Sequence, residues 1–378
     1  MTAQLRIEGS GPTGIVRIFN TDLAVLEAQV PRDDLPCTVS PIKPYLGFDM
    51  KFHAGYEVSI PLKELSGAED TLTTLFRVIP DNNKDNPYYF SYRMHVPSIP
   101  ADAKGNAYLE GSFDLGEGKY HVDWLIRNRG EHVCSFYWDT EAALPARDKS
   151  LEVVLPPNTA QSTEREPFKE EPLIERAAAE VPLNVKVLIN FAPQRAHSAT
   201  LQPLDLNALV SILRGIAREP RIGRFSIVAF NMQEQRVLYR QDTAEQIDFP
   251  ALGDALESLK LGTVDLKRLR DKKGDTQFLS GLITQEMAGK DQPDALIFAG
   301  PKVMLEEGVA TETLREVGEV EYPVFYMNYN FNPAANPWRD AIGNTVKFFK
   351  GQEYTISRPR DLWHAWTDIV TRVLKFKV

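Results

Sequence analysis

The chain has 378 residues, 43% hydrophobic and 25% charged, which is typical of a folded protein with two or three domains. Lysine and arginine total 43 against 52 aspartates and glutamates, and the resulting net charge of −9 disfavours partners such as nucleic acid or anionic lipid. No uninterrupted apolar run reaches about 18 residues, so we expect no insertion into a membrane.

Alternation of apolar and polar residues dominates positions 1–155. Every second residue is apolar in Tyr56–Leu62, Tyr120–Ile126 and Cys134–Trp138, and turn-forming residues separate these runs. Period-two alternation predicts antiparallel strands with one solvated face. About seven such runs predict a β-sandwich, and we expect no helix in this part of the chain.

One motif within this region is more specific. Leu115–Tyr120 has the pattern L-x-x-G-x-Y, and Val122 and Trp124 follow it. The motif resembles the tyrosine corner of immunoglobulin-like and fibronectin-like sandwiches, which implies a hydrogen bond from the Tyr120 hydroxyl to upstream backbone. Val122 stands where immunoglobulin domains have cysteine, so their usual disulfide between the sheets is not expected.

The chain contains two cysteines, Cys37 and Cys134. They are either buried free thiols or one long-range disulfide, and a disulfide would indicate an oxidising compartment. No signal peptide occurs before residue 20. Met1 is therefore either a native start or a replacement for a removed secretory segment.

Residues 156–181 differ in composition from both flanks, with four prolines and six glutamates against three basic residues. Proline and like charges keep a chain extended and limit the apolar area it can bury. This segment is predicted to be a linker between a sandwich domain at 1–155 and a second domain at 182–378.

Strand and helix patterns alternate after the linker. The first predicted strand is Val185–Phe191, a continuous β-branched and apolar run typical of a strand that is buried on both faces. The elements expected after it are, in order, helix Asp205–Glu219, strands Phe225–Phe230 and Arg236–Tyr239, helices Pro250–Leu259 and Phe278–Met287, strand Ala295–Phe298, helix Glu312–Val317, and strands Val324–Tyr329 and Glu353–Ile356. A final helix follows, with Ser357 and Pro359 as its start signals and an apolar stripe from Leu362 to Leu374. This alternation predicts a mostly parallel sheet covered by helices.

The order of these elements resembles a von Willebrand factor A-type domain. Supporting residues are Val185–Phe191, the segment Gly274-Asp275-Thr276 at the start of a helix, and Ala295–Phe298 as a later central strand. The resemblance implies a doubly wound α/β domain over residues 182–378. Together with the upstream sandwich, the chain is similar to secreted bacterial proteins related to this family.

Domains of this family hold a divalent cation through a D-x-S-x-S loop after the first strand, because hard cations need clustered oxygen ligands. The matching stretch here runs from Asn190 to Gln194 and lacks the carboxylate and both hydroxyls. Thr276 matches the family's threonine, whereas the later aspartate falls near Gly300. We therefore expect a degenerate metal site and no cofactor.

Loops at the same sheet edge are candidates for ligand binding. Residues 328–338 read NYNFNPAANPW, which is either a recognition surface or a turn that folds back on its own domain. The candidate residues at this rim are Asn190, Gln194, Asp275, Thr276, Lys302, Asn328, Asn330 and Trp338.

No catalytic motif such as G-x-S-x-G or H-E-x-x-H occurs, and the histidines lack metal-binding spacing. The favoured hypothesis is a non-catalytic protein-interaction or surface-assembly module that works outside a bacterial cytoplasm. The alternative is a hydrolase or modifying enzyme with a site in a cleft between the domains. A third possibility is a structural piece of a larger secreted assembly.

Overall fold

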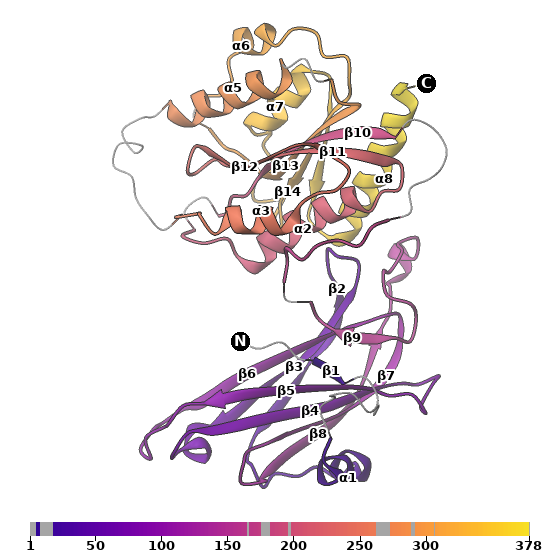
Figure 1. The fold of residues 1–378 in the computed structure, drawn as a ribbon, viewed down its shortest axis with the longest axis vertical. Helices are drawn as coiled ribbons and strands as arrows, with labels where there is room; N and C mark the ends of the chain where they lie inside the picture. The colour runs from indigo at the N-terminus through magenta and orange to yellow at the C-terminus, as the bar shows by residue number, and fades with distance from the viewer. Residues whose placement is uncertain are drawn as a thin grey trace. The chain divides into compact units, whose positions relative to one another are not determined.

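Two compact units, Met1–Arg165 and Glu166–Val378, make up the chain (Figure 1). The structure is a computed structural model. Its described residues are 5–7, 18–164, 166–174, 182–195, 198–261, 273–288, 292–305 and 307–377.

The N-terminal unit contains two antiparallel sheets, with strand orders β1-β5-β4-β7-β8 and β2-β3-β6-β9. The strands are β1 (Leu5–Ile7), β2 (Thr38–Leu46), β3 (Phe52–Pro61), β4 (Asp70–Pro80), β5 (Tyr88–Val96), β6 (Asn106–Leu115), β7 (Gly118–Arg127), β8 (Val133–Ala142) and β9 (Ala160–Ser162). One α-helix, α1 (Asn20–Ala28), and two short 3-10 helices, Leu62–Leu65 and Ala146–Asp148, complete the described elements of this unit.

Aromatic side chains from both sheets meet in the core of this unit. Tyr56 of β3 lies 5.6 Å from the Phe76 ring of β4 and 5.2 Å from Trp124 of β7, measured between ring centroids. Phe113 of β6 lies 5.4 Å from Phe76. All four are at most 2% exposed, so the two sheets form a β-sandwich held by burial of large apolar surfaces.

The Tyr120 hydroxyl donates a hydrogen bond to the Gly116 carbonyl at 2.8 Å, and the Thr159 carbonyl lies 3.1 Å from the same hydroxyl. The predicted bond from Tyr120 to upstream backbone is therefore confirmed. It connects the turn before β7 to the chain just before β9 and satisfies a buried phenol.

The expectation that this part of the chain has no helix is wrong, because α1 covers part of the outer side of one sheet. Val25 and Leu26 pack against Leu75, Leu125 and Val133. Only these two apolar side chains of the nine-residue helix are buried. Such a short helix gives almost no periodic signal, since its fold is decided by the sheet beneath it.

A disulfide joins Cys37 to Cys134 of β8, with the Cα atoms 6.2 Å apart. The bridge closes a loop between cysteines 97 positions apart in sequence. It links the segment before β2 to the sheet that contains β8, so it connects the two sheets of the sandwich.

The C-terminal unit is built around a six-stranded sheet with the order β12-β11-β10-β13-β14-β15. Its strands are β10 (Leu183–Asn190), β11 (Ile222–Asn231), β12 (Arg236–Ala244), β13 (Ala295–Pro301), β14 (Val324–Tyr329) and β15 (Gln352–Ile356). Its described helices are α2 (Pro203–Ala217), α3 (Phe249–Leu256), α5 (Gly274–Met287), α6 (Thr311–Glu316), α7 (Ala341–Phe348) and α8 (Pro359–Lys377). Neighbouring strands are parallel except β12, which returns antiparallel to β11 through a tight turn.

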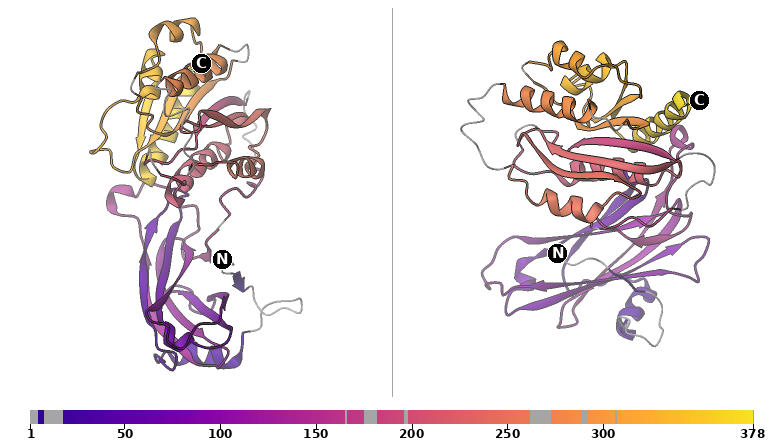
Figure 2. Two further views of the ribbon diagram at one scale, coloured as in Figure 1. Left: turned by 90° about the vertical axis from the view of Figure 1, so that its left-hand side faces the viewer. Right: turned by 45° about the horizontal axis from the view of Figure 1, so that its top comes forward.

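Helices α5, α6 and α7 lie together on one side of this sheet (Figures 1 and 2). Their apolar residues share one buried cluster with strand residues such as Leu188, Phe298 and Tyr326. Helix α2 begins with a capping box, in which Asp205 accepts a hydrogen bond from the Gln202 backbone at 3.3 Å. The predicted strands and helices of this region are present, with boundaries shifted by a few residues.

The predicted sandwich of the N-terminal unit is present, but the predicted fold of the second domain, a doubly wound von Willebrand factor A-like domain, is wrong. The described chain is mostly β: its strands lie in two antiparallel sheets and one mixed sheet, and seven described α-helices accompany them. Local patterns showed which segments are buried strands. They did not specify strand neighbours, because contacts between segments far apart in sequence decide sheet order.

Residues of the predicted linker take part in both units. Ala160–Ser162 forms β9 and pairs with β6 in the N-terminal unit. Glu171 forms ion pairs with Arg214 of α2, at 2.7 Å, and with Arg218 directly after α2, at 2.8 Å, in the C-terminal unit. Residues 175–181 lie outside the described part of the chain.

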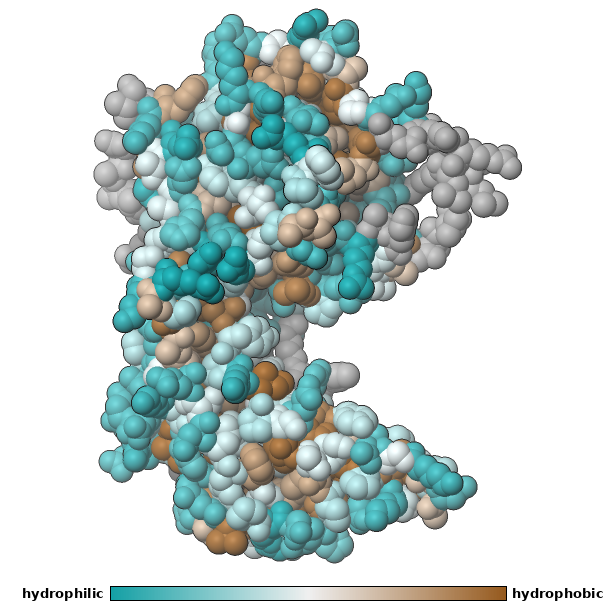
Figure 3. Space-filling view, turned by 180° about the vertical axis from the view of Figure 1, so that it is seen from behind, coloured by the Kyte–Doolittle hydropathy of each residue, from teal (hydrophilic) through white to brown (hydrophobic). Residues whose placement is uncertain are grey.

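Among the described residues, no helix is long and apolar enough to cross a membrane. Figure 3 shows hydrophilic side chains over much of the displayed face, with apolar residues in small separate groups. Scattered apolar residues of this kind are normal on protein surfaces.

Removing the disulfide should destabilise the sandwich. We expect the Cys37→Ser/Cys134→Ser variant to lose about 4 kcal/mol of unfolding free energy, because cross-linking restricts the unfolded chain over a long loop. Urea denaturation of the variant and of the oxidised wild type measures this loss. Equal midpoints and slopes for the two proteins would contradict the bridge.

Candidate functional site

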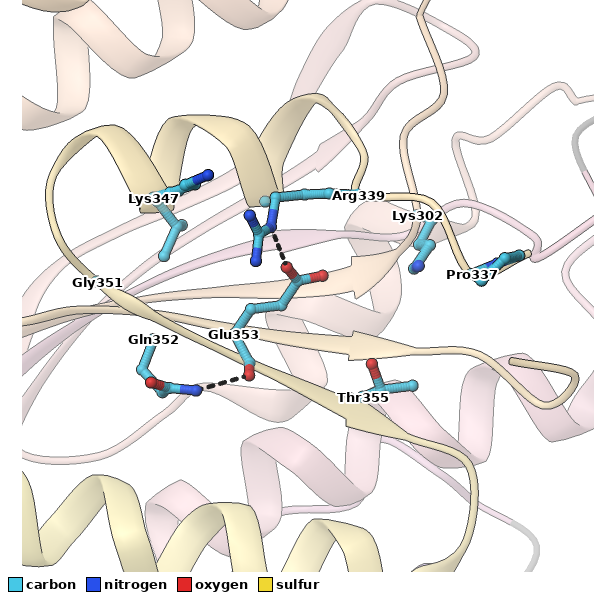
Figure 4. Close-up of a pocket in the computed structure, with 10 residues that line it drawn as sticks. Lys302, Pro337, Arg339, Lys347, Gly351, Gln352, Glu353 and Thr355 are labelled. Carbon is cyan, nitrogen blue, oxygen red and sulfur yellow. Dashed lines mark hydrogen bonds and ion pairs between the residues drawn. The ribbon is translucent and has the colours of Figure 1, made fainter. Parts of the chain in front are cut away.

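A pocket of about 300 Å³ lies in the C-terminal unit beside α7 and β15 (Figure 4). It is lined by Lys302, Pro337, Arg339, Gly343, Val346, Lys347, Gly351, Gln352, Glu353 and Thr355. These residues come from the end of β13, the loop before α7, one face of α7, and the edge strand β15.

The buried carboxylate of Asp340 fixes the start of α7. One of its oxygens accepts hydrogen bonds from the Val303 amide at 2.6 Å and the Tyr326 hydroxyl at 3.0 Å. The other accepts from the Gly343 amide at 2.8 Å, which caps the helix. Burial raises the pKa of Asp340, while the backbone hydrogen bonds oppose this shift. The carboxylate thus joins β13, β14 and α7 at the pocket.

Glu353 is the one carboxylate in the pocket lining, and other residues hold it on both sides. Its Oε2 pairs with Arg339 Nε at 3.0 Å, and its Oε1 accepts a hydrogen bond from the side-chain Nδ2 of Asn328 at 2.7 Å. The backbone of Gly343 lies close to this pair, since a Cβ there would come 2.9 Å from Glu353 Oε2. Absence of a side chain at Gly343 therefore leaves room for the Arg339–Glu353 pair.

Lys302 and Lys347 contribute two further positive charges. The Lys302 ammonium donates to the carbonyls of Trp338 at 2.6 Å and Asn336 at 3.0 Å. Among the described residues, neither lysine forms an ion pair with a carboxylate. In Figure 4 the two lysines lie on either side of the Arg339–Glu353 pair.

Several of the predicted rim residues are connected by hydrogen bonds. Gln194 donates to the Asn330 side chain at 3.2 Å, and Asn330 donates to the Asn336 carbonyl at 3.2 Å. Lys302 binds the same carbonyl and that of Trp338. The 328–338 loop is thus fixed to its own unit through its backbone and asparagines, while the Trp338 side chain remains 71% exposed.

Asn190 and Asn328 are buried at the ends of β10 and β14. Asn190 Oδ1 accepts from the Met232 amide at 3.1 Å. Its Nδ2, and Oδ1 of Asn328, have no hydrogen-bond partner among the described residues. Gly300 lies between them in the sheet, in register with Asn328, and a Cβ there would come 2.8 Å from Asn190 Cβ. These amides form a polar row, not part of the pocket lining.

Asp275 and Thr276 are engaged elsewhere. Asp275 accepts from Gln235 at 2.8 Å, and the Thr276 hydroxyl donates to the Glu307 carbonyl at 2.8 Å. Both contacts attach α5 to neighbouring loops. Among the described residues, neither side chain forms a hydrogen bond or ion pair with the loop around Trp338, so the predicted grouping of these two residues with that loop is wrong.

Sequence reasoning did not identify Arg339, Gly343, Lys347 and Glu353 as site residues. A weak signal existed, because Gly343 and Lys347 are four residues apart and so share a helix face. The sequence did not predict α7 as a helix, and nothing local placed it against β15.

A second polar cluster lies in the N-terminal unit. His53 Nδ1 is 2.9 Å from Asp114 and its Nε2 is 3.0 Å from Asp49. The Thr163 hydroxyl donates to Asp114 at 2.7 Å, and the Lys51 ammonium is 3.7 Å from it. Asp114 is 1% exposed, so these partners compensate the burial of its charge.

The geometry of this cluster fits a protonated imidazole better than a metal ion. His53, Asp49 and Asp114 could place ligand atoms within 4.8 Å of one another. However, both ring nitrogens of His53 already face carboxylates, and a metal would need a nitrogen lone pair. Burial alone lowers the pKa of His53, but the hydrogen bonds to Asp114 and Asp49 outweigh it and raise the pKa from 6.5 to about 10.

Comparison with known proteins does not assign this chain to a family. No protein-family model matches the sequence, and no curated protein matches it. The PilB minor pilin from Streptococcus sanguinis is similar with a TM-score of 0.28 and 7% identity, over 79% of this chain and 87% of the pilin.

Two glycoside-acting enzymes are similar at the same low level. A glycosyl hydrolase family 2 member from Bacteroides cellulosilyticus has a TM-score of 0.20 and 11% identity, over 85% of this chain and 39% of its own. A Bacteroides uniformis β-glucuronidase has a TM-score of 0.20 and 9% identity, over 83% and 38%. This chain therefore spans about two fifths of these enzymes, and at such TM-scores the likenesses carry no argument about function.

Replacing Asp340 should loosen the pocket. We expect Asp340→Ala to cost about 3 kcal/mol of unfolding free energy, because three donors lose their acceptor in a buried place. The matched control is Asp248→Ala, which removes the exposed cap of α3 with its single bond to Ala251 and should cost about 1 kcal/mol. Chemical denaturation compares the two, and equal losses would contradict the role of Asp340.

His53 should make stability depend on pH. Its pKa is raised on folding, so its stabilising contribution is complete below the unfolded pKa of 6.5 and is lost as pH rises through about 10. Hydrogen bonds to Asp123 and Asp139 raise the pKa of the other perturbed histidine, His121, to about 8. The change in unfolding free energy between pH 8 and pH 10 therefore reports on His53. Urea midpoints of His53→Gln should fall less than those of the wild type across that interval. Parallel pH profiles would contradict this assignment.

Proposed function

We propose that this protein is a non-catalytic protein-interaction module that works outside the cytoplasm. The partner would bind where the loop before α7 presents Trp338 beside the charged pocket. The observation that carries this proposal is the 71% exposure of the Trp338 side chain on a loop whose backbone is held in place. Tryptophan is among the residues that contribute most to binding at protein interfaces.

The backbone of Trp338 is held in place while its side chain is exposed, and this combination favours a role in binding a partner. Lys302 and Asn330 hold the carbonyls of Trp338 and Asn336, so little conformational entropy of the loop remains to be lost on binding. Met304, two residues after Lys302, is also 54% exposed and adds apolar area near the same end of β13. Rigid apolar anchors next to charges are typical of interaction surfaces.

The chemistry of the pocket supports binding more than catalysis. The described residues of its lining include no serine, cysteine or histidine, so they do not form a usual pair of nucleophile and base. Its one carboxylate, Glu353, is engaged by Arg339 and Asn328. A general acid or base must exchange a proton with a substrate, whereas both oxygens of this carboxylate already bind protein donors.

The compartment is inferred from the disulfide. A bridge between Cys37 and Cys134 persists in oxidising surroundings and is rare in the cytoplasm. The described chain has no helix that could cross a membrane. We therefore place the protein and its partner in an envelope or extracellular compartment.

Affinity capture tests this function. Immobilised wild-type protein should retain a partner from the envelope fraction of the source organism, and Trp338→Ala should lose most of it because the apolar anchor is gone. Tyr108→Ala is the matched control, since Tyr108 is 78% exposed but lies on β6 of the sandwich. Equal capture by all three proteins, or capture from the cytoplasmic fraction alone, would contradict the proposal.

A further inference from the structure

We infer that the pocket between α7 and β15 binds a carboxylate from an acidic segment of a partner polypeptide. This inference rests on the proposed function and specifies the chemistry of its ligand. The juxtaposition that carries it is three cationic side chains around a single carboxylate in a protein whose net charge is −9.

The pocket has an excess of positive charge. Lys302, Arg339 and Lys347 contribute three positive charges and Glu353 one negative charge, which leaves two positive charges. The most favourable occupant of such a site carries negative charge, because an anion would offset the two excess positive charges of the lining.

Nearby carboxylates do not neutralise this excess. Asp340 is 2% exposed, and it faces two backbone amides and the Tyr326 hydroxyl. Lys302 is held by carbonyl oxygens, which satisfy donors but carry no net charge. Lys347 lies in the last turn of α7 and is exposed. A ligand anion would therefore meet lysine ammonium groups that form no ion pair with a carboxylate in the described part of the chain.

The remaining lining favours a carboxylate over a phosphate group. Glu353 stays in the pocket, and its negative charge opposes part of the attraction that the three cationic side chains exert on a bound anion. Among the described residues, no glycine-rich loop of free backbone amides opens a helix at the pocket, since the Gly343 amide already donates to the capping Asp340 carboxylate. Thr355 and Gln352 offer polar atoms on the edge strand. These features suit one carboxylate with a few directed hydrogen bonds.

The position of Trp338 indicates how the acidic residue is presented. Its backbone carbonyl accepts a hydrogen bond from Lys302, and its chain neighbours Pro337 and Arg339 both line the pocket, so the exposed Trp338 adjoins the pocket along the chain. An acidic residue next to an apolar one would place its carboxylate in the pocket and its neighbour against the indole. Charge complementarity would give specificity, and the apolar contact would contribute affinity.

Fluorescence anisotropy with a defined probe tests this inference without the native partner. The probe is a fluorescein-labelled peptide with a run of aspartates flanked by leucines, and its matched control carries asparagines in their place. The whole protein should bind the aspartate peptide, more weakly at high salt, and should not bind the asparagine peptide. Binding of both peptides alike would overturn the carboxylate assignment.

Two substitutions with opposite expected effects separate recognition from damage. Lys347→Gln should weaken binding about fivefold, because it removes an exposed positive charge. Glu353→Gln should strengthen binding severalfold, because it removes the repelling carboxylate while its amide oxygen can still accept from Asn328. Lys350→Gln, an exposed lysine outside the pocket lining, is the matched control and should bind like the wild type. Thermal melting checks that each variant is folded.

The outcomes distinguish this inference from the proposed function. Equal weakening by Lys347→Gln and Lys350→Gln, or weaker binding by Glu353→Gln, would overturn the pocket as the site. Stronger competition by inorganic phosphate, an oligonucleotide or a uronic-acid oligosaccharide than by free aspartate peptide would overturn the ligand class. If the peptide binds as expected while Trp338→Ala still captures the native partner, the pocket stands and the proposed interaction surface fails.

Discussion

The carboxylate of Asp340 satisfies donors from three elements at once: the backbone after β13, the Tyr326 hydroxyl of β14, and the first turn of α7. Burying a charge is costly unless hydrogen bonds compensate it, so the fold holds these elements in one arrangement. The pocket depends on this arrangement, because its lining comes from the same end of β13, the same helix, and the adjacent strand β15.

A buried carboxylate with several partners also occurs in the N-terminal unit. Asp114 is buried and fastened by His53, Thr163 and Lys51, which come from β3, the chain after β9 and the turn before β3. There the result is a closed polar cluster in which every charge has a partner. Around Glu353, by contrast, two lysines have no acidic partner among the described residues. This difference separates a structural cluster from a candidate binding site.

The sequence offered two alternatives for the loop before α7, a surface for recognition or a turn that folds back on its own domain, and the loop has features of both. Its asparagines and backbone are bonded to the same unit, as in a turn that folds back, yet this bonding leaves the Trp338 side chain exposed. Many asparagines and prolines give such a loop its hydrogen-bond donors and its stiffness. A rigid loop loses less entropy on binding than a flexible one, so order and recognition are compatible.

The sequence by itself determined the local structure where one pattern was strong. Alternation identified the strands of the sandwich, the L-x-x-G-x-Y motif placed the Tyr120 hydrogen bond, and apolar runs such as Val324–Tyr329 identified buried strands. Lys302, Asn330 and Trp338 were predicted as rim residues from their position after such strands, and the structure connects them through hydrogen bonds to the loop backbone. Tertiary structure decided the rest: the fold class, helices α1 and α7, and the partners of Arg339 and Glu353. Short helices and ion pairs between distant segments leave no periodic signal, because they are stabilised by contacts that exist only after the chain has folded.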